Sequence, residues 1–111
     1  MNKYEWVLSA LESGEDATMK VFGQSMMPII KSASLLTFRK TDDYKVGDVV
    51  ISRVKSRIID AHQITKIDAE GRFLISNNKG RDNGWTRKIF GRVIAVNDEP
   101  FGRSPGNEGN L

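Results

Sequence analysis

The sequence contains no cysteine and only one histidine, His62, among its 111 residues. The absence of cysteine excludes a disulfide framework, a thiol nucleophile and a thiolate metal site. A single imidazole also excludes a zinc site built from several histidines, although a cation site made of carboxylates stays open. We therefore expect no cofactor and no resident metal ion in the chemistry of this chain.

Long apolar runs are absent as well. No stretch approaches the ~20 apolar residues that a membrane-spanning helix needs. The first six residues lack the basic region and the apolar run of a secretory signal. These absences predict a cytoplasmic protein without a membrane anchor, and a virus-encoded (phage) chain in the host cytoplasm would fit them.

Charge is distributed unevenly along the chain, whose formal net charge is +3. Residues 1–19 carry one lysine against four acidic residues, whereas residues 39–92 carry thirteen Lys or Arg against seven Asp or Glu. A basic body can attract nucleic acid or an acidic protein. Because acidic residues are interspersed and no dense basic run occurs, we favour a solvated mixed surface over a nucleic-acid-binding one.

The N-terminal segment has the spacing of an amphipathic helix. Tyr4, Val7, Leu8 and Leu11 fall at i, i+3, i+4 and i+7, and Gly14 then offers a stop. We favour a short helix packed on the domain core over a helix that docks a partner or a membrane surface. The acidic polar face argues against binding to anionic lipid.

From residue 18 onward the sequence shows short β-prone runs separated by turn residues. This pattern predicts one mainly β domain with a coiled or partly closed sheet. We expect an N-terminal helix within residues 1–16, a β domain over residues 17–97 and a flexible tail over residues 98–111. The predicted strands are Met19–Phe22, Leu35–Arg39, Asp48–Arg53, Arg57–Lys66, Arg72–Asn77 and Lys88–Val96.

The segment Gly23–Pro28 carries the first chemical signal. It places Ser25 on a tight turn between a strand-like run and an apolar pair, which is a position for an exposed nucleophile. The backbone N–H of such a serine can help to stabilise an oxyanion. On local grounds alone, such a serine is more often a helix N-cap or an ordinary turn residue.

Four segments in order support the nucleophile interpretation. They are Gly23-Gln24-Ser25-Met26-Met27-Pro28, Gly47-Asp48-Val49-Val50, Asp60-Ala61-His62-Gln63-Ile64, and Lys79-Gly80-Arg81-Asp82-Asn83 followed by Gly91-Arg92-Val93. Together they resemble the serine signature, the following Gly-Asp-Val-Val strand, the general-base segment and the Gly-Asp-Asn box of the superfamily of signal peptidase I and LexA-type self-cleaving repressors.

The resemblance implies roles for individual residues. Ser25 would be the nucleophile, His62 would be the general base in place of the lysine of bacterial enzymes, and Asp82 would orient the histidine. The fold would be a coiled all-β domain that binds a protein substrate as an extended strand. The residues expected to form the oxyanion hole and the substrate groove are Gly23, Gln24 and Met26.

Two of these assignments have competing interpretations. A lone histidine in a strand is commonly a packing or surface residue, although a neutral imidazole suits a base at pH 7. Asp60 lies two residues from His62 and is a second candidate to orient the ring, since such residues share a strand face. Asp82 could instead simply open a hairpin turn at Asn83-Gly84.

The function predicted from these residues is a soluble serine endopeptidase that cleaves a separate protein through a Ser25–His62 dyad aided by Asp82. Self-cleavage is less favoured, because the 24 residues before Ser25 contain no helix-turn-helix and no Ala-Gly or Cys-Gly hinge. The alternative is an inactive module of the same fold that binds a protein or nucleic-acid partner.

Overall fold

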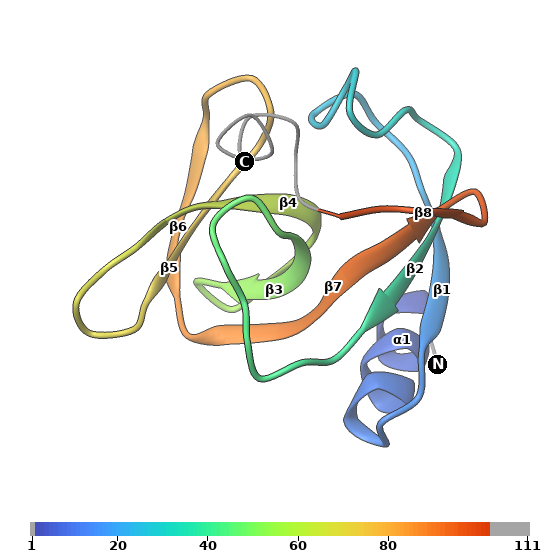
Figure 1. Ribbon diagram of the computed structural model, residues 1–111, viewed down its shortest axis with the longest axis horizontal. Helices are drawn as coiled ribbons and strands as arrows, with labels where there is room; N and C mark the ends of the chain where they lie inside the picture. The colour runs from blue at the N-terminus through green and yellow to red at the C-terminus, as the bar shows by residue number, and fades with distance from the viewer. Residues whose placement is uncertain (1, 103–111) are drawn as a thin grey trace.

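The computed structural model describes residues 2–102 and contains one helix followed by an antiparallel sheet (Figure 1). The elements are α1 (Lys3–Glu12), β1 (Ala17–Val21), β2 (Ser34–Arg39), β3 (Val49–Val54), β4 (Arg57–Ile67), β5 (Phe73–Ser76), β6 (Asp82–Thr86), β7 (Lys88–Val96) and β8 (Glu99–Pro100). The prediction of a mainly β fold with a short N-terminal helix is confirmed.

The strands form one eight-stranded sheet in the order β1-β2-β7-β3-β4-β5-β6, with β8 paired to β7. All neighbouring strands are antiparallel. The sheet is coiled and does not close. Register shifts in five of the strand pairs mark β-bulges, which bend strands and increase their twist.

Strand β3 lies in the middle of the sheet and is buried on both faces. Val49 and Ile51 pack into a core with α1, β1 and β2, whereas Val50 and Val54 pack into a second core beside β4 and β5. Successive side chains of a strand point to opposite faces, so a coiled sheet with apolar residues on both sides requires a continuous apolar run here. The run Val49-Val50-Ile51 supplies it.

Helix α1 packs against the first of these cores. Asn2 caps it, because its Oδ1 accepts the N–H of Glu5 at 3.0 Å, and the chain leaves the helix through Gly14 at φ +85°. Val7 and Leu11 are buried, which confirms the predicted packing on the domain core.

Replacement of Leu11 by alanine tests how much this helix contributes to stability. Leu11 is 1% exposed, so we expect the variant to lose about 2–4 kcal/mol of unfolding free energy in a denaturant titration. The matched control on the same helix is Trp6→Ala. Trp6 is 70% exposed, and the control should change stability by less than about 1 kcal/mol. Equal losses in the two variants would contradict this assignment of the core.

Two strands differ from the sequence expectation. A turn was predicted at Asn83-Gly84, but both residues lie in β6. The turn lies earlier, at Asn77–Arg81, where the Asn77 N–H donates to the Arg81 carbonyl. Strand β8 lies within the segment predicted to be a tail, where it pairs with Ala95 and Val96. Residues 103–111 of that segment lie outside the described residues.

Candidate active site

Three segments that are distant in the sequence meet at one end of the molecule (Figure 1). They are the loop after β1 (residues 22–33, here called the serine loop), strand β4, and the turn between β5 and β6 (residues 77–81, here called the asparagine turn). Three strands separate β1 from β4 within the sheet, so only the coiling of the sheet lets the serine loop reach β4.

The serine loop is held in shape by backbone and core contacts. Gly23 has φ +109°, a conformation that favours glycine, and its N–H donates to the Oγ of Ser32 at 3.1 Å. Met26 and Ile30 are buried, and the Ile30 N–H donates to the Met26 carbonyl at 2.9 Å. These anchors present Ser25 on a single turn, with its side chain half-buried.

Ser25, His62 and Asn83 form a chain of hydrogen bonds. The Oγ of Ser25 lies 2.9 Å from Nε2 of His62, and Nδ1 of His62 lies 2.7 Å from Oδ1 of Asn83. An amide oxygen can only accept, so Nδ1 carries the ring proton and donates to Asn83. Nε2 is then the unprotonated nitrogen, which accepts the hydroxyl proton of Ser25. This is the tautomer that a general base requires.

Asp82 lies away from the histidine. Its Oδ1 accepts a hydrogen bond from the Oγ of Ser76 at 2.6 Å across the β5–β6 pair. Neighbouring residues of a strand point to opposite faces, so β6 presents Asn83 to His62. The position beside the ring that was predicted for Asp82 is therefore occupied by the next residue, Asn83.

Asp60, the second predicted partner of the ring, is also engaged elsewhere. Its Oδ2 accepts a hydrogen bond from the hydroxyl of Tyr4 at 3.3 Å. Ala61 has φ +49°. Val50 pairs with His62 and Ser52 pairs with Ile59, so a step of two residues in β3 lies opposite a step of three residues in β4. This bulge breaks the alternation on which the predicted shared face of Asp60 and His62 depended.

Asn78 joins the asparagine turn to the serine loop. Its backbone N–H donates to the carbonyl of Ser25 at 2.8 Å, and its side-chain Nδ2 donates to the carbonyl of Met27 at 3.0 Å. Neither Asn78 nor Asn83 was identified from the sequence. The consecutive pair Asn77-Asn78 before a glycine was the available signal, because asparagine side chains commonly bond to neighbouring backbone in turns.

The predicted groove residues lie around the serine. Gly23 and Met26 line a small cavity beside Ser25, whereas Gln24 is exposed and its carbonyl accepts the Met27 N–H at 3.2 Å. Within residues 2–102, the backbone N–H groups of Ser25 and Met26 have no hydrogen-bond acceptor. Such N–H groups beside a nucleophile are suited to bind an oxyanion.

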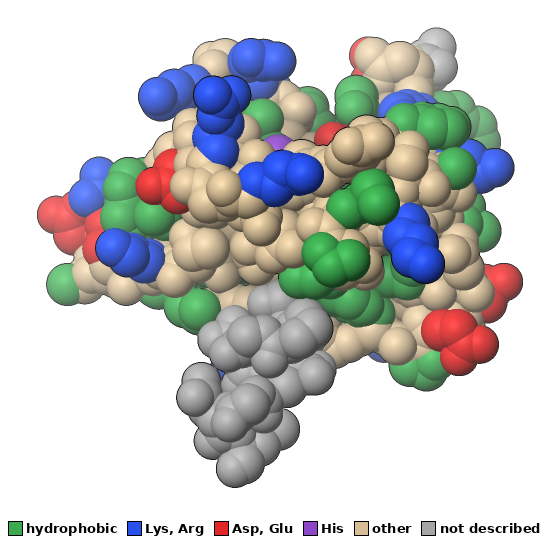
Figure 2. Space-filling view, turned by 90° about the horizontal axis from the view of Figure 1, so that it is seen from above, with side chains coloured by type: hydrophobic (Ala, Val, Ile, Leu, Met, Phe, Trp, Pro, Cys, Tyr) green, Lys and Arg blue, Asp and Glu red, His purple; other side chains and the backbone are tan. Residues whose placement is uncertain are grey.

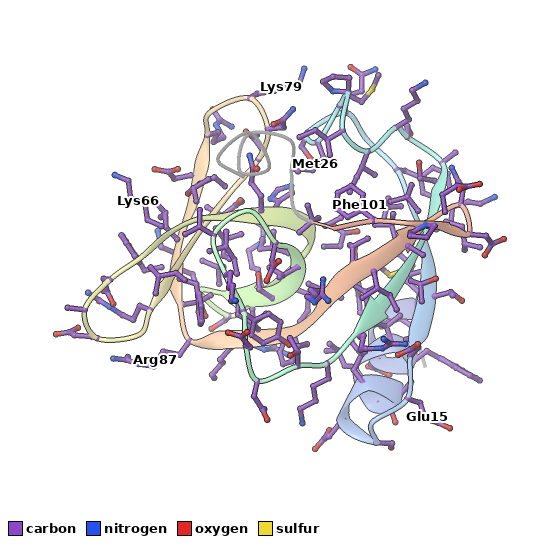
Figure 3. All side chains as sticks on the ribbon, viewed as in Figure 1. Glu15, Met26, Lys66, Lys79, Arg87 and Phe101 are labelled. Carbon is purple, nitrogen blue, oxygen red and sulfur yellow. The ribbon has the colours of Figure 1, made fainter. Side chains whose placement is uncertain are left out.

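Basic side chains surround this end of the molecule. Figure 2 looks onto it and shows the single histidine in purple, largely covered by its neighbours, with several Lys and Arg side chains around it. Lys31 belongs to the serine loop, and Lys79 and Arg81 belong to the asparagine turn; all three are exposed. In Figure 3 the Lys79 side chain extends outward at this end, whereas Met26 is buried.

Residues 2–102 hold no group of three or more His, Cys, Asp or Glu side chains placed to bind a metal ion. The contacts of Ser25 with His62 and of His62 with Asn83 are typical of nucleophilic acyl transfer.

The sequence also matches the model of a known protein family. A sequence model described as Peptidase S24-like matches residues 2–94, which is well over half of the chain. This chain belongs to the Peptidase S24-like family. The family is part of the LexA and signal peptidase superfamily, so the resemblance inferred from the four segments is confirmed. Most members of the Peptidase S24-like family are serine peptidases.

A search among curated proteins finds no match to the chain. Within residues 2–102, no helix of this Peptidase S24-like domain is both long and apolar enough to cross a membrane.

Proposed function

We propose that this chain is a serine endopeptidase that cleaves a separate protein, with Ser25 as nucleophile, His62 as general base and Asn83 as the residue that orients His62. The observation that carries the proposal is the pair of short contacts on opposite sides of one imidazole, 2.9 Å to Ser25 and 2.7 Å to Asn83. A base in hydrogen-bond reach of the nucleophile and oriented by a third group is the signature of an activated serine.

The reaction follows from these positions. Ser25 Oγ attacks the scissile carbonyl while His62 Nε2 takes its proton, and the backbone N–H groups of Ser25 and Met26 bind the oxyanion. The imidazolium then protonates the leaving amine. In the second half, His62 takes a proton from the water that attacks the acyl-enzyme and returns it to Ser25 Oγ as the acid leaves. Asn83 holds the ring and accepts from Nδ1 throughout, as asparagine does in Cys-His-Asn proteases.

The substrate in this proposal is a protein segment bound as an extended strand beside the serine loop. The family preference implies a small side chain just before the scissile bond. A trap experiment can identify the protein: Ser25→Ala retains the groove and lacks the nucleophile, so it should retain a substrate that the wild type cleaves and releases.

Labelling with a fluorophosphonate tests the proposed activity without knowledge of the substrate. This reagent modifies activated serines, and intact-mass and peptide mapping should place one adduct on Ser25 of the wild type. An unlabelled wild type with normal folding would contradict the proposal. It would favour the alternative of an inactive binding module, for which the exposed Lys31, Lys79 and Arg81 offer a basic surface.

The pH dependence of this labelling identifies the base. We expect labelling to be lost in acid and to level off at higher pH, because imidazole acts as a base only in its neutral form. Stopped assays at constant ionic strength would measure the profile. A rate that still rises through roughly pH 9–10 would instead indicate a lysine base.

Asn78 provides a separate prediction about positioning. Asn78→Ala removes the side-chain bond to Met27 and keeps the backbone bond to Ser25, so the labelling rate should fall about tenfold. Thermal unfolding should change little, because the lost bond contributes only about 1 kcal/mol. Lys79→Ala, an exposed change in the same turn, is the control and should leave both quantities unchanged. An unaltered rate in Asn78→Ala would reject its role in positioning the nucleophile.

A further inference from the structure

A small cavity lies directly beside Ser25, between the serine loop and the bulge of β4. Its walls include Val21, Gly23, Met26, Asp60 and Ala61. The cavity has a volume of about 30 Å³, which gives room for a methyl or hydroxymethyl group and little more. A side chain next to the scissile bond would enter this cavity as its carbonyl approaches Ser25.

One wall of this cavity is acidic, which a pocket that selects only for small apolar side chains does not need. Asp60 lies on the bulge, and Tyr4 on α1 donates its hydroxyl to the Asp60 Oδ2. Within residues 2–102, Tyr4 is the one side-chain donor that Asp60 has, so its other oxygen is available to a bound group. Burial and the neighbouring Asp60 carboxylate raise the pKa of the Tyr4 phenol, which stays a donor at neutral pH.

The second charged residue of the cavity is basic. Lys31 contributes to the lining and is itself exposed to solvent. A cationic substrate side chain would meet both this ammonium group and a space too small for a long chain. The cavity therefore suits a short neutral group that can donate a hydrogen bond to a carboxylate.

We propose that this cavity receives the side chain preceding the scissile bond, and that Asp60 makes it select serine over alanine at that position. The proposal rests on the proposed function of Ser25 and adds a substrate class to it. A hydroxymethyl group fits the volume and gives the carboxylate a donor, whereas a methyl group leaves the carboxylate oxygen unpaired. Sites built to bond a hydroxyl discriminate against analogues that lack it.

Peptidyl diphenyl phosphonates provide the test, because they modify an activated serine and carry a chosen side chain next to the reacting centre. Three acetyl-Ala-Ala probes with methyl, hydroxymethyl and isopropyl side chains should be compared by their second-order rates of adduct formation on Ser25. We expect the hydroxymethyl probe to react about five- to tenfold faster than the methyl probe. The isopropyl probe should react at least about tenfold more slowly than the methyl probe, because it exceeds the volume.

Variants assign the discrimination to Asp60. Asp60→Ala should reduce the hydroxymethyl preference to about onefold, and Asp60→Asn, which keeps the shape and an acceptor oxygen, should retain part of it. Tyr4→Phe keeps the carboxylate but frees it, so the preference should fall to about twofold. Glu70→Gln, in the exposed turn between β4 and β5, is the control and should keep the wild-type ratio. Thermal unfolding of each variant establishes that it is folded.

The outcomes separate the two proposals. Adducts on Ser25 at equal rates for the methyl and hydroxymethyl probes, or a full preference that survives in Asp60→Ala, would overturn the assignment of the cavity and leave the peptidase intact. Failure of the fluorophosphonate and of all three probes to modify folded wild type would overturn the proposed function and the cavity assignment together.

Discussion

Alanine in place of Ser25 should remove fluorophosphonate labelling completely, and alanine in place of His62 should lower its rate by about 10⁴-fold or more. The first change deletes the attacking oxygen, and the second deletes the group that accepts its proton. Labelling time courses followed by intact mass measure both effects. Both side chains are only half-buried, so the thermal transitions of the two variants should stay near that of the wild type.

The control for these variants is Ser9→Ala, which removes an exposed serine hydroxyl on α1 and should label like the wild type. A Ser25→Ala protein that still acquires an adduct would show that another serine reacts. A His62→Ala protein with a near wild-type rate would reject imidazole as the base, even if Ser25 carried the label.

Replacement of Asn83 by alanine should lower the labelling rate by about 10²–10³-fold. The change removes the acceptor that keeps the proton on Nδ1 of His62, and a wrong histidine tautomer is known to be costly in serine triads, at about 10⁴-fold in turnover. Asn83→Asp supplies the same acceptor with a negative charge, so it should retain activity within about tenfold of the wild type. This rescue distinguishes an orienting role from general damage to β6.

Asp82→Asn is the matched control, one residue earlier in the same strand. The Asp82 carboxylate bonds to Ser76 and not to His62, so this change should alter labelling by less than about threefold. A large loss in Asp82→Asn with none in Asn83→Ala would return the orienting role to the aspartate that the sequence resemblance indicated.

The contrast between Asp82 and Asn83 shows what sequence could and could not predict about the site. The contact between Ser25 and His62 was expected, because both residues stand in recognisable segments with the right order. The third residue depended on the register of a short strand that begins at Asp82. A shift of one residue exchanges the two faces of a strand, and nothing local in Asp82-Asn83-Gly84 reports which residue faces inward.

The fold shows the same division. Strand β7 was predicted with its observed bounds because Lys88–Val96 is long and strongly apolar, and the helix was predicted because its apolar spacing is regular. Strand β6 was missed because its five residues have no apolar alternation and are half exposed. The bulge at Ala61 was also beyond prediction, since a positive φ at alanine is imposed by the pairing of β3 with β4.

The hairpin of β5 and β6 carries both asparagines that touch the reactive residues, and β6 is the last strand at one edge of the sheet. Edge strands with few buried side chains, such as β6, open locally at lower free energy than the central strands. Opening of β6 would free His62 from Asn83 while β3 and β7 stayed paired. Nucleophilicity at Ser25 would then be lost at denaturant concentrations that leave the bulk of the sheet folded. During synthesis on the ribosome, Ser25 would likewise lack an activated hydroxyl until Asn83 had joined the sheet and bonded to His62.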